Sequence, residues 1–154
     1  MLEAEEAARA GGPVARAAGR FQDLRAGEEI YDALGFEPVL DDGSDALARL
    51  RLRAAELDQS LRLARAAFRR LPEGGVKIEA ARIPDSGSGY ARAETPRGPA
   101  VLSLALDNGE VADARLEAPS AALLALAGTV AEGRELGDAL AGVASLDISP
   151  WGIA

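Results

Sequence analysis

The chain has 154 residues and a formal net charge of −8, and it contains neither cysteine nor histidine. Without these residue types it can form no disulfide, no thiolate or imidazole metal site and no histidine-based catalytic pair. Any catalysis would have to use carboxylates, arginine, serine, tyrosine or Lys77, the only lysine. The acidic charge argues against a nucleic-acid-binding protein, which needs a basic surface.

The length predicts one domain over residues 1–154, but a thin core. The 34 alanines make up nearly half of the hydrophobic residues, so little large apolar surface is available for burial. No stretch is apolar and long enough for a transmembrane helix or a signal peptide. We therefore expect a cytoplasmic protein that is incomplete without a partner and that reaches the cytoplasmic side of a membrane only through partners.

The first third of the chain predicts short elements. Residues 1–10 have a helix-forming composition, and Gly11-Gly12-Pro13 ends that helix. Residues 28–34 predict a second short helix, and residues 36–40 are extended. Residues 41–44 form a turn that also supplies the N-cap of the next helix.

The strongest periodic signal predicts a long helix over residues 45–71. Eight apolar residues recur there at alternating spacings of three and four, a heptad-like pattern. This apolar seam consists of Leu47, Leu50, Ala54, Leu57, Leu61, Ala64, Phe68 and Leu71. The segment also has a net charge of +4. It therefore presents either a solvated basic face or a surface for an acidic partner, and the seam could pair with itself or with another helix.

The second half of the chain predicts a small sheet. Residues 76–83 predict a strand or an extended link, and residues 85–89 predict a flexible turn in which Gly87-Ser88-Gly89 is a hinge rather than a phosphate loop. Three short strands follow, at residues 90–94, 100–106 and 111–116. Asn108-Gly109 predicts a type I′ hairpin between the last two strands.

Two helices, at residues 121–131 and 135–146, complete the predicted elements. Ser120 has no histidine to activate it, so it is interpreted as a helix N-cap. The order of elements predicts an α+β fold that is mainly helical, with a small antiparallel sheet and C-terminal helices.

The segment from Glu94 to Gly98 carries a candidate binding site. Pro96 restricts the backbone, whereas Gly98 permits the close approach of another chain or a ligand. Arg97 between them would point in a restricted direction and suit a carboxylate, an anion or a cofactor edge. The segment also fits an ordinary edge-strand turn. A further hypothesis is an independent enzyme that uses Arg97, Glu94 and Tyr90 on a small acid.

Several motifs follow one another along the chain in a recognisable order. They comprise residues 12–19, 23–25, 31–36, 58–62, 89–90, 94–98, 116–120 and 144–148. In order and spacing they resemble the large hydrogenase-like subunit of NADH-quinone oxidoreductase (respiratory complex I), in particular its C-terminal region. That family is related to the large subunits of nickel-iron hydrogenases.

The resemblance implies a helix bundle that packs against a small iron-sulfur subunit beside a quinone cavity. The residues that it places at the cavity are Pro96, Arg97, Gly98, Pro119 and Ser120. The lack of cysteine excludes nickel-iron chemistry, and the His and Tyr that hold the quinone headgroup in the family would come from a part of the subunit that this chain lacks. Residues 149–154 also depart from the Gly-Glu-x-Asp-Arg ending of the family.

We therefore expect a fragment, split subunit or diverged homologue that belongs to a complex-I-like oxidoreductase. It would bind no metal or cofactor directly, show no catalysis alone and help to shape a quinone cavity. Its partners would be the iron-sulfur subunit, other subunits of the complex or a second copy. The alternative is a non-enzymatic helical module for binding or assembly.

Overall fold

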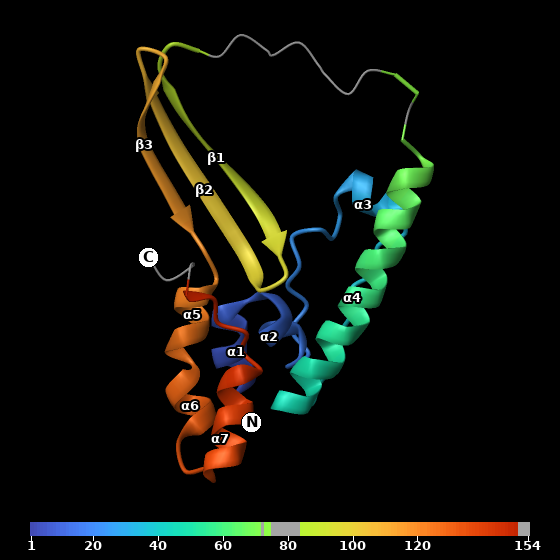
Figure 1. Ribbon diagram of the computed structural model, residues 1–154, viewed down its shortest axis with the longest axis vertical. Coiled ribbons are helices and arrows are strands. Elements are labelled where there is room, and N and C mark those ends of the chain that lie inside the picture. Colours follow the sequence, from blue (N-terminus) through green and yellow to red (C-terminus); the bar gives the residue numbers. More distant parts are fainter. Residues whose placement is uncertain (72, 75–83, 151–154) are drawn as a thin grey trace.

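The computed structural model describes residues 1–71, 73–74 and 84–150, and it confirms the predicted α+β class. Most of the helices form a body at one end of the molecule, and both a three-stranded antiparallel sheet and the longest helix extend away from it (Figure 1). The strand or link that we expected over residues 76–83 lies outside the described residues.

Two short helices begin the chain. Helix α1 (Ala4–Ala10) ends at Gly11 as predicted, but α2 (Gly12–Arg16) follows at once. Gly11 and Gly12 have φ angles of +67° and +56°, in the left-handed region that glycine adopts readily. Pro13 lies in the first turn of α2, where its missing N–H has no helical acceptor. The sequence prediction missed α2 because Gly-Gly-Pro also has the composition of a helix stop.

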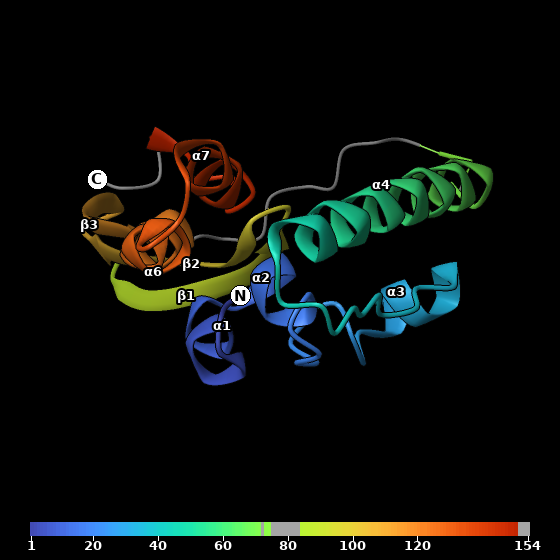
Figure 2. The same ribbon diagram turned by 90° about the horizontal axis from the view of Figure 1, so that it is seen from below.

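The next two helices confirm their predictions. Helix α3 (Glu29–Leu34) is followed by the long helix α4 (Ala46–Arg69), and the two lie side by side (Figure 2). The N-cap of α4 is Asp45, whose carboxylate accepts a hydrogen bond from the Ala48 amide at 2.7 Å. The cap therefore lies one residue beyond the turn at residues 41–44 that we expected to supply it.

Helix α4 is unusual because its buried face includes polar residues whereas its apolar seam is exposed. Its buried residues are Ala48, Arg49, Leu52, Gln59 and Leu63. The large side chains of the apolar seam lie on another face and are between 49% and 76% exposed. The helix thus turns two polar side chains inward and leaves its apolar seam uncovered.

The sheet has the order β1-β2-β3, built from β1 (Gly87–Thr95), β2 (Gly98–Asp107) and β3 (Glu110–Glu117). The expected hinge at Gly87-Ser88-Gly89 is wrong, because these residues pair with β2 within the sheet. Cross-strand pairing overrides their low strand propensity. Asn108 and Gly109 both have positive φ angles, which confirms the type I′ hairpin.

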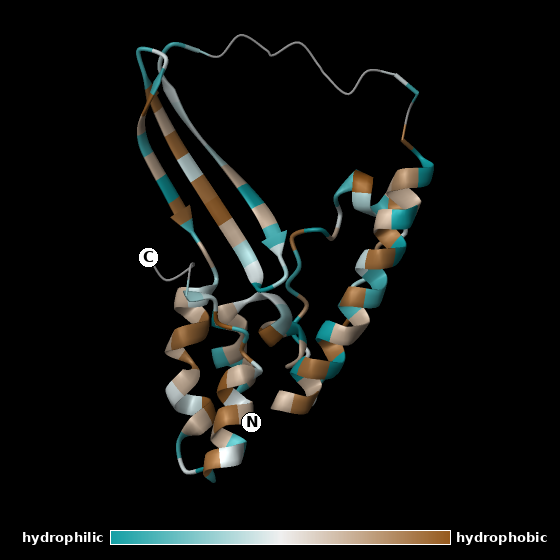
Figure 3. Cartoon of the chain, in the orientation of Figure 1, coloured by the Kyte–Doolittle hydropathy of each residue, from teal (hydrophilic) through white to brown (hydrophobic). Residues whose placement is uncertain are grey.

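One face of the sheet is entirely apolar. The alternate β2 residues Ala100, Leu102, Leu104 and Leu106 share it with small residues of β1, because directly paired residues point to the same side. Leu102 and Leu104 are 41% and 38% exposed. Hydrophobic stretches are visible along both β2 and α4 (Figure 3).

The C-terminal helices form the rest of the body. The single helix that we expected over residues 121–131 is broken at Leu126, which gives α5 (Ser120–Ala125) and α6 (Ala127–Ala131). Helix α7 (Leu136–Ala144) falls within its predicted range and packs on α6.

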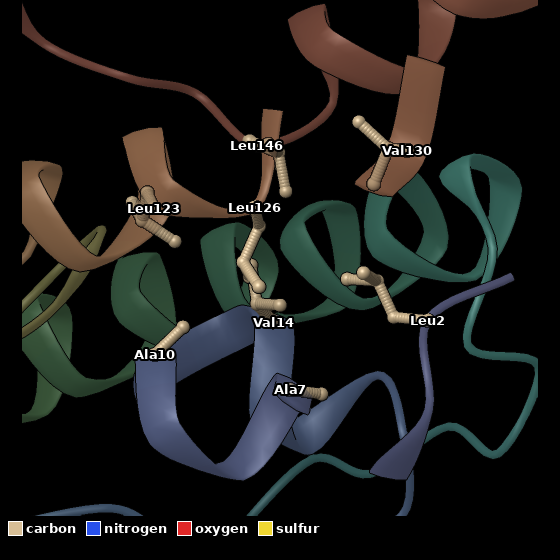
Figure 4. Close-up of a cluster of buried hydrophobic side chains, with 8 residues drawn as sticks. All are labelled: Leu2, Ala7, Ala10, Val14, Leu123, Leu126, Val130 and Leu146. Carbon is tan, nitrogen blue, oxygen red and sulfur yellow. The ribbon is translucent and has the colours of Figure 1, made fainter. Parts of the chain in front are cut away.

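The core lies where the two ends of the chain meet. Residues of the N-terminal segment face residues from α5, α6 and the segment that follows α7 (Figure 4). This cluster comprises Leu2, Ala7, Ala10, Val14, Leu123, Leu126, Val130 and Leu146. A second, smaller cluster of Ala17, Ala48 and Leu52 holds the start of α4 against α2.

Candidate functional site

The turn between β1 and β2 is the centre of the candidate site. Pro96 and Arg97 form its two-residue loop, and Thr95 pairs with Gly98 across it. The Thr95 hydroxyl donates to the Gly98 carbonyl at 2.8 Å and accepts from the Arg97 amide at 3.2 Å. These bonds of Thr95 fix the direction of the loop.

Gly98 allows a close backbone approach, and the partner in that approach is this chain itself. A Cβ at Gly12 would lie 2.9 Å from the Arg97 carbonyl oxygen and closer still to the Gly98 Cα. A Cβ at Gly98, whose φ angle is +136°, would lie 3.3 Å from the Pro119 Cβ. The start of α2, the β1–β2 turn and the start of α5 are therefore in direct contact.

Arg97 binds a carboxylate, and that carboxylate also belongs to this chain. Its Nε donates to the Asp147 carbonyl at 2.8 Å, and its Nη2 donates to Asp147 Oδ1 at 3.2 Å. On the other side, Arg53 Nη1 lies 3.4 Å from Asp147 Oδ2. Asp147 itself has a φ angle of +56°, which few residues other than glycine adopt. The guanidinium groups of Arg53 and Arg97 thus hold the Asp147 carboxylate from two sides, and the backbone of Asp147 has a restricted conformation.

Arg53 joins α4 to the β1–β2 turn and to the segment that follows α7. It donates to the Pro96 carbonyl at 3.1 Å and to the Leu146 carbonyl at 3.2 Å. Burial lowers its pKa, and the charge of Asp147 partly opposes that effect. We refer to the meeting point of Gly12, Arg53, Arg97 and Asp147 as the junction.

Ser120 lies at the edge of the junction with 1% of its surface exposed. The expectation that it caps α5 is wrong, because the helix begins at Ser120 itself and Pro119 occupies the N-cap position. The Ser120 hydroxyl instead accepts a hydrogen bond from the Ser149 amide at 3.1 Å. It therefore fastens the segment after Asp147 to α5.

A buried ion network lies next to the junction. Arg16, which is 1% exposed, donates to Glu56 at 2.6 Å and to Glu94 at 2.9 Å, and lies 3.2 Å from Asp23. Asp23 also pairs with Arg25 at 2.6 Å. We call these five residues the Arg16 network. It links α2, α4 and the end of β1, which are far apart in the sequence.

The pKa directions show that the network stabilises charged groups. Burial opposes the charge of Arg16, but hydrogen bonding and the charge of Glu56 outweigh burial, so the pKa of Arg16 is raised. Burial likewise opposes ionisation of Asp23, but hydrogen bonds from Arg25 outweigh it and lower the pKa of Asp23. Asp23 is therefore ionised at neutral pH and is unsuited to act as a general acid.

A cavity of about 480 Å³ lies beside the junction and the Arg16 network. Its wall combines charged, hydroxyl and apolar side chains. They are Arg25, Tyr31, Arg53, Glu56, Leu57, Ser60, Leu63, Glu94, Thr95 and Pro96. Within the described part of the chain, no group of three acidic residues is arranged to hold a metal ion.

The structure does not assemble the small-acid enzyme site of Arg97, Glu94 and Tyr90. Tyr90 is 73% exposed on β1, four residues from Glu94 and so about 13 Å along the strand. The Glu94 carboxylate is occupied by Arg16 and by the Leu24 amide. Arg97 is bound to Asp147.

Sequence reasoning missed several residues that build the site. Asp147 and Arg16 lie inside motifs that support the family resemblance, so those motifs were an available signal. Arg53 and Glu56 are i,i+3 neighbours on α4, and nothing in its charge pattern separates them from exposed residues. Their roles depend on contacts with segments about 40 or more residues away.

Comparison with known proteins decides the family. The family model for the 49 Kd subunit of respiratory-chain NADH dehydrogenase matches residues 1–86, more than half of the chain. The chain belongs to this family.

Curated relatives agree with this assignment. The corresponding subunit of NADH-quinone oxidoreductase from Desulfotalea psychrophila is 35% identical over 145 residues, and that from Wolbachia pipientis wMel is 31% identical over 167 residues. Each alignment covers 89% of this chain but only 38% and 43% of the relative. This member of the 49-kDa family therefore spans about two fifths of the length of these relatives.

A solved structure supports the same relationship. A chain in the structure of the membrane-bound sulfane sulfur reductase, an archaeal respiratory membrane complex, matches with a TM-score of 0.81 and 27% identity. The match covers 93% of this chain and 42% of that chain. The predicted resemblance to the hydrogenase-like subunit of complex I is confirmed. Among the described residues, no helix is long and apolar enough to cross a membrane.

Proposed function

We propose that this member of the 49-kDa family is a non-redox part of a complex-I-like NADH-quinone oxidoreductase and that it shapes the wall of a quinone cavity. One observation carries the proposal. The five residues that the resemblance places at the cavity, Pro96, Arg97, Gly98, Pro119 and Ser120, converge on one junction. The 480 Å³ cavity opens beside that junction and shares Arg53 with it, and Pro96 is the one of these five residues that lines the cavity.

The lining of the cavity suits a quinone headgroup. Such a group is a neutral, flat ring with two carbonyl oxygens, so it needs hydrogen-bond donors and apolar walls. Arg25 and Tyr31 supply donors, and Leu57 and Leu63 supply apolar surface. The Arg16 network fixes the positions of Arg25 and the end of β1, which form part of this wall.

The electron carriers would lie on other polypeptides. The chain has no cysteine or histidine to ligate an iron-sulfur cluster, so an iron-sulfur subunit would supply that chemistry. The exposed apolar surfaces of the sheet and of α4 are consistent with packing against other subunits. Through these partners the chain would lie at the cytoplasmic side of a membrane.

The first test uses the purified chain alone. With NADH and a water-soluble short-chain quinone, we expect no NADH oxidation and no quinone reduction. Turnover by the chain without partners would show that it is an enzyme in its own right and would contradict the proposal.

The second test uses the chain purified together with its partner subunits. Arg97→Ala should lower kcat/KM for quinone by roughly tenfold or more, because it removes two charge-assisted hydrogen bonds at the junction. NADH oxidation by ferricyanide, which accepts electrons before they reach quinone, should be unchanged. Arg92→Ala, at an exposed position of the same hairpin, is the matched control. Equal quinone activity in the two variants would exclude a role for the junction.

A further inference from the structure

Arg49 is a buried cation that the candidate site does not use. It lies on the inward face of α4 and is 2% exposed, and Arg16 is 1% exposed. Arg16 is surrounded by three carboxylates, whereas no ion pair formed within residues 1–71, 73–74 and 84–150 includes Arg49. A buried guanidinium is costly unless an anion and hydrogen-bond acceptors replace the water that it loses. Arg49 therefore lacks the counter-charge that its position requires.

The hydrogen bonds of Arg49 leave one edge of its guanidinium unused. Its Nε donates to the Ser145 hydroxyl at 2.9 Å, and its Nη1 donates to the Ser44 carbonyl at 3.4 Å. Both acceptors are neutral. In the part of the chain that the structure describes, Nη2 has no acceptor. The edge formed by Nη1 and Nη2 suits a carboxylate, which accepts two parallel N–H groups.

The charges around Arg49 do not compensate for its burial. Burial lowers the pKa of Arg49, the charge of Asp45 partly opposes that effect, and the charge of Arg53 adds to it. The Asp45 carboxylate already accepts the N-cap hydrogen bond from the Ala48 amide. A further anion at Arg49 would therefore stabilise the buried charge both electrostatically and by hydrogen bonding.

A cavity of about 360 Å³ lies beside Arg49, between the start of α4 and the helices α6 and α7. Apolar side chains form much of its wall, including Leu2, Leu47, Val130 and Ala141. It shares no residue with the 480 Å³ cavity of the candidate site. A ligand in this second cavity could thus reach Arg49 and place an apolar portion against the wall.

The acidic residues in the same wall narrow the choice of anion. Asp45 and Asp138 would repel a doubly charged phosphate more strongly than a singly charged carboxylate. We propose that this cavity binds a carboxylate group on a short apolar chain, with the carboxylate seated on Arg49. A free small carboxylic acid and a glutamate side chain of another polypeptide share this chemistry.

A titration of the full chain with sodium pentanoate tests the chemistry of the site. At constant ionic strength, we expect saturable shifts of the backbone amide NMR signals of Ala46 and Gly142, which line the cavity. Pentanamide has a similar chain without the charge, and it should bind roughly tenfold more weakly or worse, as should inorganic phosphate. Equal binding of pentanamide, or tighter binding of phosphate, would overturn the proposal.

Two substitutions test the role of Arg49. Arg49→Met should abolish pentanoate binding, whereas Arg51→Met, on the exposed surface of the same helix, is the matched control and should bind as the wild type does. Far-UV circular dichroism checks that the variants fold. If Arg49→Met does not fold, Arg49→Lys replaces it, and should bind pentanoate several-fold more weakly because lysine lacks the two-donor edge. Unchanged binding in the Arg49 variant would overturn the proposal.

The chain purified together with its partner subunits identifies the source of the carboxylate. Saturation-transfer NMR observes the pentanoate signals and therefore suits a large complex. If the ligand is a free acid, the complex binds pentanoate as the chain alone does. If a glutamate of another polypeptide fills the cavity, the chain alone binds pentanoate and the complex does not. No binding by either would overturn the proposal. These outcomes leave the quinone cavity untouched, because its tests use Arg97.

Discussion

The junction and the outer surfaces of this molecule are built from opposite kinds of residue. Arg16 is buried among carboxylates, and Arg53 and Arg97 converge on Asp147. The outer face of α4 and one face of the sheet carry leucines that are largely exposed. In a self-contained globular protein the distribution is usually the reverse. The difference indicates that charge holds the site together, while the apolar surfaces are available for other polypeptides.

This division follows from what each kind of contact requires. A buried guanidinium is tolerated only when several acceptors surround it. The Arg16 network supplies three carboxylates, and Arg16 also donates to the Gln22 carbonyl, which lies outside the network. Such a network needs particular partners in particular directions. An apolar face requires only a complementary surface, which a second copy or another subunit can provide.

Replacement of Arg16 should cause the largest loss of folding stability. Arg16→Met leaves Glu56 and Glu94 buried without their common cation, so we expect the free energy of unfolding to fall by about 3–5 kcal/mol. Arg51→Met, on the exposed surface of α4, should change it by less than about 0.5 kcal/mol. Urea denaturation at neutral pH measures both. Similar losses of stability in the two variants would show that the buried arginine stabilises the fold no more than an exposed one.

The glycine pair at the junction should give the next largest effect. Gly12→Ala drives a Cβ into the Gly98 backbone at a left-handed position, and should cost roughly 3 kcal/mol. Gly35→Ala is the matched control, because Gly35 is also left-handed but has no neighbour within 4 Å. It should cost about 1–2 kcal/mol. Equal costs would mean that the backbone conformation alone, without the close contact, explains the need for glycine.

The carboxylate between the two arginines should contribute less, because it is partly exposed. Asp147→Asn keeps a side chain that tolerates a positive φ angle but removes the charge, and should destabilise the chain by about 1 kcal/mol. Asp113→Asn, on exposed β3, should have almost no effect. High salt should shrink the first effect. If the effect of Asp147→Asn is unchanged at high salt, its contribution is not electrostatic.

Local signals predicted much of the fold. Asn108-Gly109 specifies its hairpin, and the periodicity of α4 predicts its length to within two residues at each end. The wrong predictions concern segments whose structure depends on contacts with other parts of the chain. Gly87-Ser88-Gly89 joins a strand only because β2 lies beside it, and α2 exists because the chain reverses at two left-handed glycines.

The site was less predictable than the fold. The family motifs identified Arg97 and Ser120, but the partners of these residues, Asp147 and Ser149, are 50 and 29 residues away in the sequence. Periodicity locates the apolar seam of α4 but does not say whether another element covers it. The inward face could not be inferred, because its polar residues become favourable only when the segments carrying their partners are in place.

The smallest effect that we predict is the change at acidic pH in the contribution of Asp23 to folding stability. The pKa of Asp23 in the folded chain lies below its ordinary value, because hydrogen bonds from Arg25 outweigh burial. Ionised Asp23 therefore stabilises the fold at neutral pH, and that contribution is lost as the pH falls below about 4 through its folded-state pKa. The stability difference between the wild type and Asp23→Asn should be constant from neutral pH to about pH 5 and then narrow. Asp58→Asn, at a pair whose acid is 67% exposed, should show little difference at any pH. If the stability difference between the wild type and Asp23→Asn instead widens on acidification, the charge of Asp23 destabilises the network. That result would weaken the contrast between the junction and the surface.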